Sequence, residues 1–169
     1  MLTEKQIREL LEILNERLKA LGEIGEVGLV GGAVMCLVFN ARESTKDIDA
    51  IFEPTSIIRE IIKDIAVEKC LPLNWMNDAA KGYIQSGFQR QNIMELSHLR
   101  VWCPDPTYML AMKCISARWD TNDRDDVIFL INHLKLKKPS EVFSIIESYY
   151  PKKQIPPKTQ FLIEELLEG

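Results

Sequence analysis

The sequence predicts an α+β fold in which a mixed α/β half is followed by an all-helical half. Helical periodicity marks the N-terminus, short β-type segments alternate with helices up to about residue 102, and only helical patterns follow. The 169 residues are 46% hydrophobic and 27% charged, which suits one globular domain with a real core. We therefore expect a single domain, with an α/β core over about 1–104 and a helical part over about 105–169.

The first elements are a helix, a short strand and a buried helix. Residues 3–21 carry leucines at helical spacing, with Thr3 placed to cap the start and Gly22 following the end. Residues 27–30 predict an apolar strand that stops at a glycine pair. Residues 33–39 are apolar and rich in Ala, Met and Leu, so we expect a helix there.

A polar loop over residues 40–46 leads to a strand over residues 47–52. The strand alternates, so one face carries Ile48, Ala50 and Phe52, and the other carries Asp47, Asp49 and Ile51. Pro54 ends this strand, and Ser56 is the expected N-cap of a helix that reaches about Lys69.

The rest of the chain predicts a loop, one strand and several helices. Residues 71–78 read as a loop, after which Asp78 is expected to cap a short helix to about Ile84. Residues 93–102 alternate over their whole length and predict a single strand. The expected later helices cover about 107–119, 124–135, 140–149 and 159–167.

Composition excludes several classes of protein. There is no run of about 18 uncharged apolar residues, so no membrane span is expected. The N-terminal segment carries acidic residues within its apolar pattern, unlike a targeting peptide, and a cytoplasmic location is the expectation. A net charge of −4 disfavours a strongly basic nucleic-acid-coating protein. The four scattered cysteines have neither zinc-site nor disulfide-framework spacing.

Two aspartates separated by one isoleucine stand out in the stretch STKDIDAIF. Asp47 and Asp49 project from the same face of the expected strand. Two carboxylates at such a short distance repel each other unless a cation neutralises them. A divalent ion such as Mg²⁺ binds one or two carboxylates together with substrate phosphates. The alternative is an ordinary strand edge in contact with solvent.

A glycine pair, Gly31-Gly32, lies between the expected strand and the buried helix. Glycines at such a junction allow the backbone to approach a ligand closely, with N–H groups directed at it. A polyphosphate is the ligand that this arrangement favours. A tight turn without a ligand is the alternative. Neither the glycine pair nor the Asp-x-Asp pattern is specific when taken alone.

The two features together resemble the nucleotidyltransferase superfamily that includes DNA polymerase β. Its signature is hydrophobic-Gly-Gly/Ser, a spacer, and Asp-hydrophobic-Asp/Glu-hydrophobic, matched here by Val30-Gly31-Gly32 and Asp47-Ile48-Asp49-Ala50. The spacer of 14 residues is slightly longer than usual. The stretch R-x-S-T-K-D-I-D resembles small bacterial and archaeal members related to abortive-infection and toxin–antitoxin nucleotidyltransferases. A later stretch with Lys113, Arg118, Asp123 and Asp126 resembles a helical segment of those proteins.

The resemblance implies a nucleotidyltransferase-like, mixed and twisted sheet with flanking helices and a C-terminal helical cluster. It implies that Asp47 and Asp49 bind Mg²⁺ or Mn²⁺ and act in catalysis. It also implies that the nucleotide is bound by Gly31, Gly32, Thr45, Lys46 and Lys113. For Lys113, a lysine on the helix surface or a partner for a core acid is an equal alternative. Arg118, Asp123 and Asp126 are expected to form an ion-pair network between two helices.

The superfamily normally supplies a third carboxylate from a later strand. Glu95 is the first candidate, because its strand is expected beside the strand of the two aspartates. Asp78 is the alternative, although capping a helix would equally explain it. Neither residue lies in a diagnostic motif.

The function implied is metal-dependent transfer of a nucleoside monophosphate from an NTP to a hydroxyl acceptor. The acceptor is an RNA, a protein or a small molecule, and the sequence does not choose among them. The alternative is a catalytically inactive nucleotide-binding or protein-interaction module of antitoxin-like type, with a protein partner or a second copy of the chain. These interpretations differ in whether replacing Asp47 or Asp49 removes an activity or leaves partner binding intact.

Overall fold

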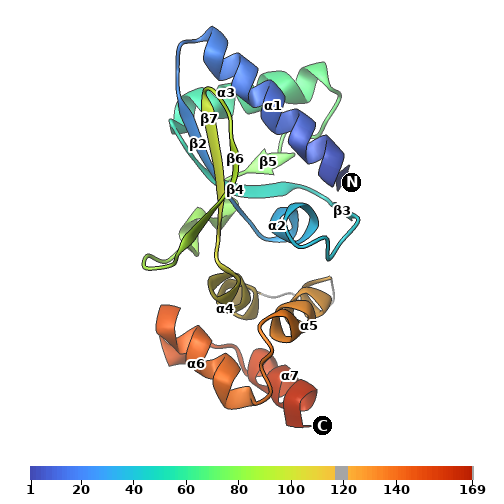
Figure 1. Cartoon of the computed structure of the whole chain (residues 1–169), viewed down its shortest axis with the longest axis vertical. Coiled ribbons are helices and arrows are strands. Elements are labelled where there is room, and N and C mark those ends of the chain that lie inside the picture. Colours follow the sequence, from blue (N-terminus) through green and yellow to red (C-terminus); the bar gives the residue numbers. More distant parts are fainter. Residues whose placement is uncertain (117–121, 169) are drawn as a thin grey trace. The chain divides into compact units, whose positions relative to one another are not determined.

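The computed structural model describes residues 1–116 and 122–168. The chain divides into two compact units, one formed by Met1–Gly82 and Arg90–Cys103 and the other by Tyr83–Gln89 and Pro104–Gly169. The first unit has an α/β architecture with a mixed sheet, and the second is mainly helical (Figure 1). The protein therefore has the predicted nucleotidyltransferase-like α+β fold. Expectations for residues 117–121, including Arg118, lie outside the described residues.

The first unit is built on a five-stranded sheet. Its strand order is β5 (Met76–Asn77), β4 (Ile48–Glu53), β2 (Gly25–Val30), β7 (Leu99–Pro104) and β6 (Arg90–Glu95). Strand β2 is antiparallel to β4 and parallel to β7, and β4 is parallel to β5. A separate two-stranded sheet pairs β1 (Leu2–Thr3) with β3 (Ser44–Thr45). The central strands β4 and β2 thus lie side by side, which matters for the site.

Helices α1 (Glu4–Ala20) and α3 (Thr55–Glu68) pack against one face of this sheet (Figure 1). A side chain at Gly25 on β2 would meet Leu18 of α1 and Ile58 of α3, so both helices lie close over the strand. Helix α2 (Gly32–Leu37) follows β2 directly. Thr3 caps α1 in a capping box with Gln6, as the sequence predicted.

The second unit contains α4 (Pro106–Ser116), α5 (Asp123–His133), α6 (Pro139–Tyr149), the 3-10 turn η2 (Lys152–Gln154) and α7 (Pro157–Glu168). Segment 83–89 belongs to it through tyrosine hydrogen bonds. The hydroxyl of Tyr108 accepts from the backbone N–H of Gln85 at 2.7 Å, and that of Tyr150 donates to the carbonyl of Tyr83 at 2.8 Å. Side chains of α4 and of the residue that follows α6 therefore hold this segment.

Several predictions about local structure are wrong, and among them the loop predicted over residues 40–46 contains β3. Residues 93–102 do not form one strand, because the chain turns back after β6 and the Leu96 N–H bonds to the carbonyl of Leu99 at 2.8 Å. Ser56 is not the N-cap of α3, which begins at Thr55 after Pro54. The first backbone N–H of α3, that of Thr55, instead donates to the Glu53 carboxylate. The loop predicted before Asp78 contains β5, which is too short to leave a periodic pattern.

None of the helices in residues 1–116 and 122–168 combines the length and the apolar character that a bilayer crossing requires.

Candidate functional site

The glycine pair forms the turn between β2 and α2. Gly31 has φ = 65° and ψ = −143°, a conformation that is open to glycine and strained for other residues. A Cβ at Gly31 would lie 3.2 Å from Oδ2 of Asp49, tighter than an ordinary contact. The glycine therefore serves both the backbone conformation and the close approach of the Asp49 carboxylate.

Asp49 reaches this position because of the register of β4. It pairs with Val30, the last residue of β2, so its backbone lies beside the start of the glycine turn. Along residues 48–52 buried and half-buried side chains alternate, with Ile48, Ala50 and Phe52 buried and Asp49 half-buried. Asp47, one residue before β4, is also half-buried and continues the alternation. The sequence thus placed both aspartates on the more exposed face.

Thr45 contacts the glycine turn at Gly32. Its side chain is only 4% exposed, and its hydroxyl donates to the carbonyl of Asp47 at 3.1 Å. A Cβ at Gly32 would lie 2.7 Å from the Thr45 Oγ1. Thr45 is held in β3 by pairing with Leu2, whereas Lys46 is exposed to solvent. Of the predicted nucleotide-binding residues, Gly31, Gly32 and Thr45 are therefore neighbours.

Glu95 is not beside the aspartates, and the expectation that its strand adjoins theirs is wrong. The strands that flank β4 are β2 and β5, while β6 is the edge strand beyond β2 and β7. Three strand spacings amount to roughly 14 Å. Glu95 is exposed and faces Arg100 at 3.9 Å, and Arg100 is in register with Glu26, near the start of β2. Glu95 thus lies near the end of the sheet opposite to the glycine turn.

Asp78 is closer in the topology but has another contact. It follows β5, in which Asn77 is in register with Asp49. The Asp78 carboxylate accepts from Nη2 of Arg59 at 2.5 Å, and the side chain that caps the short 3-10 helix η1 (Ala79–Gly82) is that of Asn77. The predicted capping role of Asp78 is therefore wrong. Asn77, the neighbour of Asp49, was missed because a two-residue strand gives no sequence signal.

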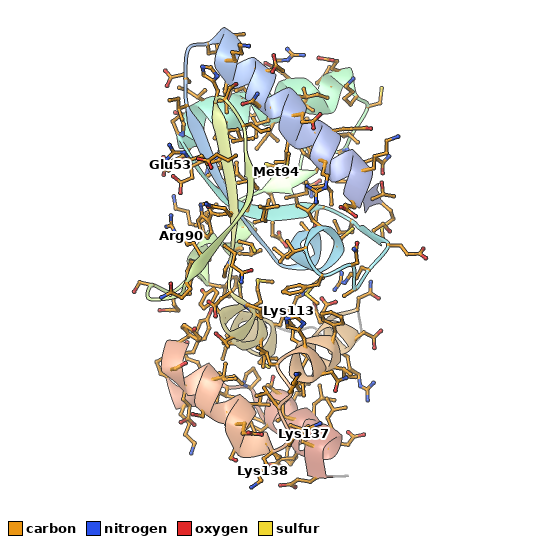
Figure 2. The ribbon with its side chains drawn as sticks, viewed as in Figure 1. Glu53, Arg90, Met94, Lys113, Lys137 and Lys138 are labelled. Atoms are coloured by element: carbon orange, nitrogen blue, oxygen red, sulfur yellow. The ribbon has the colours of Figure 1, made fainter. Side chains whose placement is uncertain are left out.

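Lys113 belongs to the second unit, on α4 (Figure 2). Its ammonium group lies 2.8 Å from the carboxylate of Asp123 and 2.7 Å from that of Asp126, both on α5. Lys113 is 7% exposed and Asp126 is 2% exposed. Lys113 is thus a buried partner of core acids and connects α4 with α5. A partner for a core acid was one of the structural roles that the sequence left open for this lysine. Its nucleotide-binding role stays a prediction.

The arrangement in the first unit combines an open backbone turn with carboxylate oxygens. Within residues 1–116 and 122–168, no three His, Cys, Asp or Glu side chains lie close enough together to hold a metal ion. The residues that do converge are Gly31, Gly32, Thr45 and Asp49. Such a set offers backbone donors for an anion beside a carboxylate for a cation.

Residues 5–152 match the model of a protein family described as "Nucleotidyltransferase of unknown function (DUF6036)". The chain belongs to this family. The matched range includes the glycine turn, both aspartates of the DxD pattern and Lys113. No curated protein and no solved structure matched the chain. The membership agrees with the superfamily that the two short motifs indicated.

As a member of this family, the protein carries the two motifs of the superfamily signature on adjacent elements. The glycine turn follows β2, Asp47 precedes β4 and Asp49 lies near its start. The antiparallel pairing of the two strands brings these ends together. The distance along the chain between the motifs is bridged by α2 and the anchored segment that contains β3. The fold thereby explains how two motifs that are separated in the sequence come to lie next to each other.

Proposed function

We propose that this protein transfers a nucleoside monophosphate from an NTP to a hydroxyl acceptor in a metal-dependent reaction, with release of pyrophosphate. The observation that carries the proposal is the contact between the Gly31 turn and the Asp49 carboxylate. The backbone of this turn favours glycine, and a Cβ at Gly31 would lie 3.2 Å from Oδ2 of Asp49. The turn therefore places a carboxylate, a ligand type for a divalent cation, beside backbone amides, a donor type for a phosphate.

The nucleotide site we propose is formed by the backbone of Gly31 and Gly32 with Thr45 and Lys46. Amide groups at a glycine turn bind phosphate oxygens without a side chain in the way. Thr45 is buried and fixed by its bond to the carbonyl of Asp47, so it shapes the turn. Lys46 is exposed, so its ammonium group is accessible to a phosphate as a point charge.

The donor set fits Mg²⁺ or Mn²⁺. Asp47 and Asp49 are both half-buried and offer carboxylate oxygens, the ligands that hard divalent ions prefer. One or two carboxylates with substrate phosphates are a usual Mg²⁺ site, so we propose that these residues bind the ion together with the nucleotide. When bound, such an ion stabilises the charge that develops on the transferred phosphate and orients the attacking oxygen.

The protein's own groups would hold and align the reactants. The glycine turn would bind the phosphates, and the carboxylates would set the position of the reacting phosphate relative to the turn. A third carboxylate is not proposed, because Glu95 lies at the far end of the sheet and Asp78 is engaged by Arg59. The acceptor, whether RNA, protein or small molecule, is left for experiment to identify.

A transfer assay tests the proposal. The purified protein is incubated with each α-labelled NTP, Mg²⁺ or Mn²⁺, and separate fractions of cell RNA, protein and small molecules. We expect a labelled product that disappears when EDTA is added and in Asp49→Asn and Asp47→Asn. The matched control is Asp64→Asn, which changes an exposed aspartate on α3 of the same unit and is expected to retain activity.

The outcomes separate the proposal from its alternative. Labelling that persists in both Asp47 and Asp49 variants would refute the proposed site. Metal-dependent NTP binding without any labelled product in any fraction would favour a nucleotide-binding or interaction module of antitoxin-like type. In that case a partner of the protein is expected to bind equally well to the native chain and to Asp49→Asn.

A further inference from the structure

Arg42 lies against the glycine turn of the proposed site. A Cβ at Gly32 would lie 2.9 Å from Nη1 of Arg42 and 3.6 Å from its Cζ. Any side chain larger than hydrogen at position 32 would therefore displace the guanidinium. The second glycine of the pair leaves room for a positive charge, as the first leaves room for the Asp49 carboxylate.

The backbone around Arg42 is fixed on both sides. The N–H of Ala41 donates to the carbonyl of Met35 at 2.9 Å, which ties the start of the segment to α2. Two residues after Arg42, Ser44 pairs with Thr3 in the small two-stranded sheet. The segment that looked like a free polar loop in the sequence is thus anchored at both ends, and Arg42 is held at the turn.

The charge of Arg42 acts on the Cys36 thiol of α2. Burial raises the pKa of the Cys36 thiol and the carboxylate of Glu4 raises it further, while the Arg42 guanidinium acts in the opposite direction. A guanidinium is always protonated and presents planar donors that match two oxygens of a phosphate. A permanent cation held beside a glycine turn is suited to a polyphosphate.

The two glycines have different neighbours. The missing side chain of Gly31 faces Asp49, and that of Gly32 faces Arg42 and Thr45. A phosphate chain bound along the turn would therefore meet carboxylate-bound metal at one residue and a guanidinium at the next. This order assigns the reacting phosphate to the Asp49 side and the remaining phosphates to the Arg42 side.

We propose that Arg42 binds the two phosphates of the NTP that are not transferred. In the reaction the acceptor oxygen forms a bond to the α-phosphorus and loses its proton to solvent, while the bond from that phosphorus to the bridging oxygen breaks. The electron pair stays on the departing pyrophosphate, whose charge the guanidinium offsets. This inference rests on the proposed function, because it assigns a residue to the same nucleotide site.

Binding measurements with NTP and with the corresponding NMP test this role. Calorimetry in the presence of Mg²⁺ is done on the native protein, Arg42→Met and Arg42→Lys, with thermal unfolding as the check on folding. Loss of a hydrogen-bonded charge corresponds to a decrease in affinity of about tenfold or more. We expect that decrease for the NTP with Arg42→Met, a smaller one with Arg42→Lys, and a change below about twofold for the NMP.

The control is Arg8→Met, which removes an arginine of the same unit that pairs with Glu4 on α1. It is expected to bind NTP as the native protein does. Equal losses for NTP and NMP in the Arg42 variants would mean a structural brace, and unchanged NTP affinity would mean no contact; either result would overturn the inference. A native protein that binds no NTP would refute the proposed function itself, and the Arg42 role with it.

Discussion

At the scale of single residues, Gly31 is the position where conformation and chemistry meet. Its backbone angles are strained for any residue other than glycine. The position that a Cβ would occupy faces the carboxylate of Asp49. Replacement by alanine therefore has two effects, one on folding and one on the site. These effects are separable by experiment, because only the second depends on Asp49.

We expect Gly31→Ala to lower the free energy of unfolding by about 1–3 kcal/mol, the usual cost of forcing a side chain into such a conformation. Metal-dependent NTP binding is expected to fall further than the loss of folded protein explains, because the new Cβ presses on Asp49. Denaturant unfolding and calorimetry measure the two effects. Gly82→Ala is the control, since a Cβ there meets nothing within 4 Å. An unfolding free energy equal in the two variants would contradict this account of Gly31.

The sequence was informative about residues whose roles depend on local pattern. The alternation in DIDAIF was enough to put Asp47 and Asp49 on one face, and a glycine pair after an apolar strand was enough to predict a turn. The third carboxylate was different, because it depends on which strands are neighbours. Glu95 was misplaced because the turn after β6 contains neither glycine nor proline, so its alternation continues into β7.

At the scale of elements, the start of α6 shows how a side chain stabilises a helix end. The carboxylate of Glu141 accepts from the backbone N–H groups of Lys137 and Lys138 at 2.7 and 2.8 Å. Both lysines are labelled in Figure 2 beside α6. These backbone bonds are the main cause that lowers the pKa of Glu141 below its usual value of 4.5. The ionised carboxylate is therefore favoured by folding.

Glu141→Ala is expected to show a pH-dependent loss of thermal stability. Because the folded-state pKa is depressed, the stabilisation is present above the usual carboxyl pKa and is lost as pH falls through the folded-state value. The difference in Tm between native protein and variant is thus expected to be largest near pH 7 and to shrink in acid. Glu147→Ala, six residues further along the same helix, is the control. A difference that grows on acidification would contradict the assignment.

At the scale of the whole molecule, the chain passes between its two units three times, after Gly82, Gln89 and Cys103. The sequence did not predict that segment 83–89 belongs with the helices, because the contacts that hold it come from residues far along the chain. Tyr108 and Tyr150 bond to this segment, and Phe88 stacks on Tyr108 with ring centroids 4.4 Å apart. Burial and the neighbouring Tyr108 hydroxyl raise the pKa of Tyr150, so its hydroxyl stays a donor.

Tyr150→Phe removes the donor to the carbonyl of Tyr83. We expect a loss of about 1 kcal/mol in the stability of this attachment, since a net hydrogen bond contributes on that order. Hydrogen–deuterium exchange of peptides covering residues 83–89 is expected to become faster. Tyr149→Phe is the matched control, because that hydroxyl pairs with Thr107 on α4. Equal exchange in native protein and Tyr150→Phe would show that the Tyr150 hydroxyl does not hold the segment.

The central claim is that the Gly31 turn and Asp49 form one metal-dependent nucleotide site. Titration calorimetry of each NTP, with Mg²⁺ and with EDTA, tests it most directly on native protein, Asp49→Asn and Asp64→Asn. The account predicts Mg²⁺-dependent binding by the native protein and Asp64→Asn, and an affinity at least about tenfold weaker in Asp49→Asn, where a charged partner is lost. Binding that is independent of Mg²⁺, or equally tight in Asp49→Asn, would contradict it.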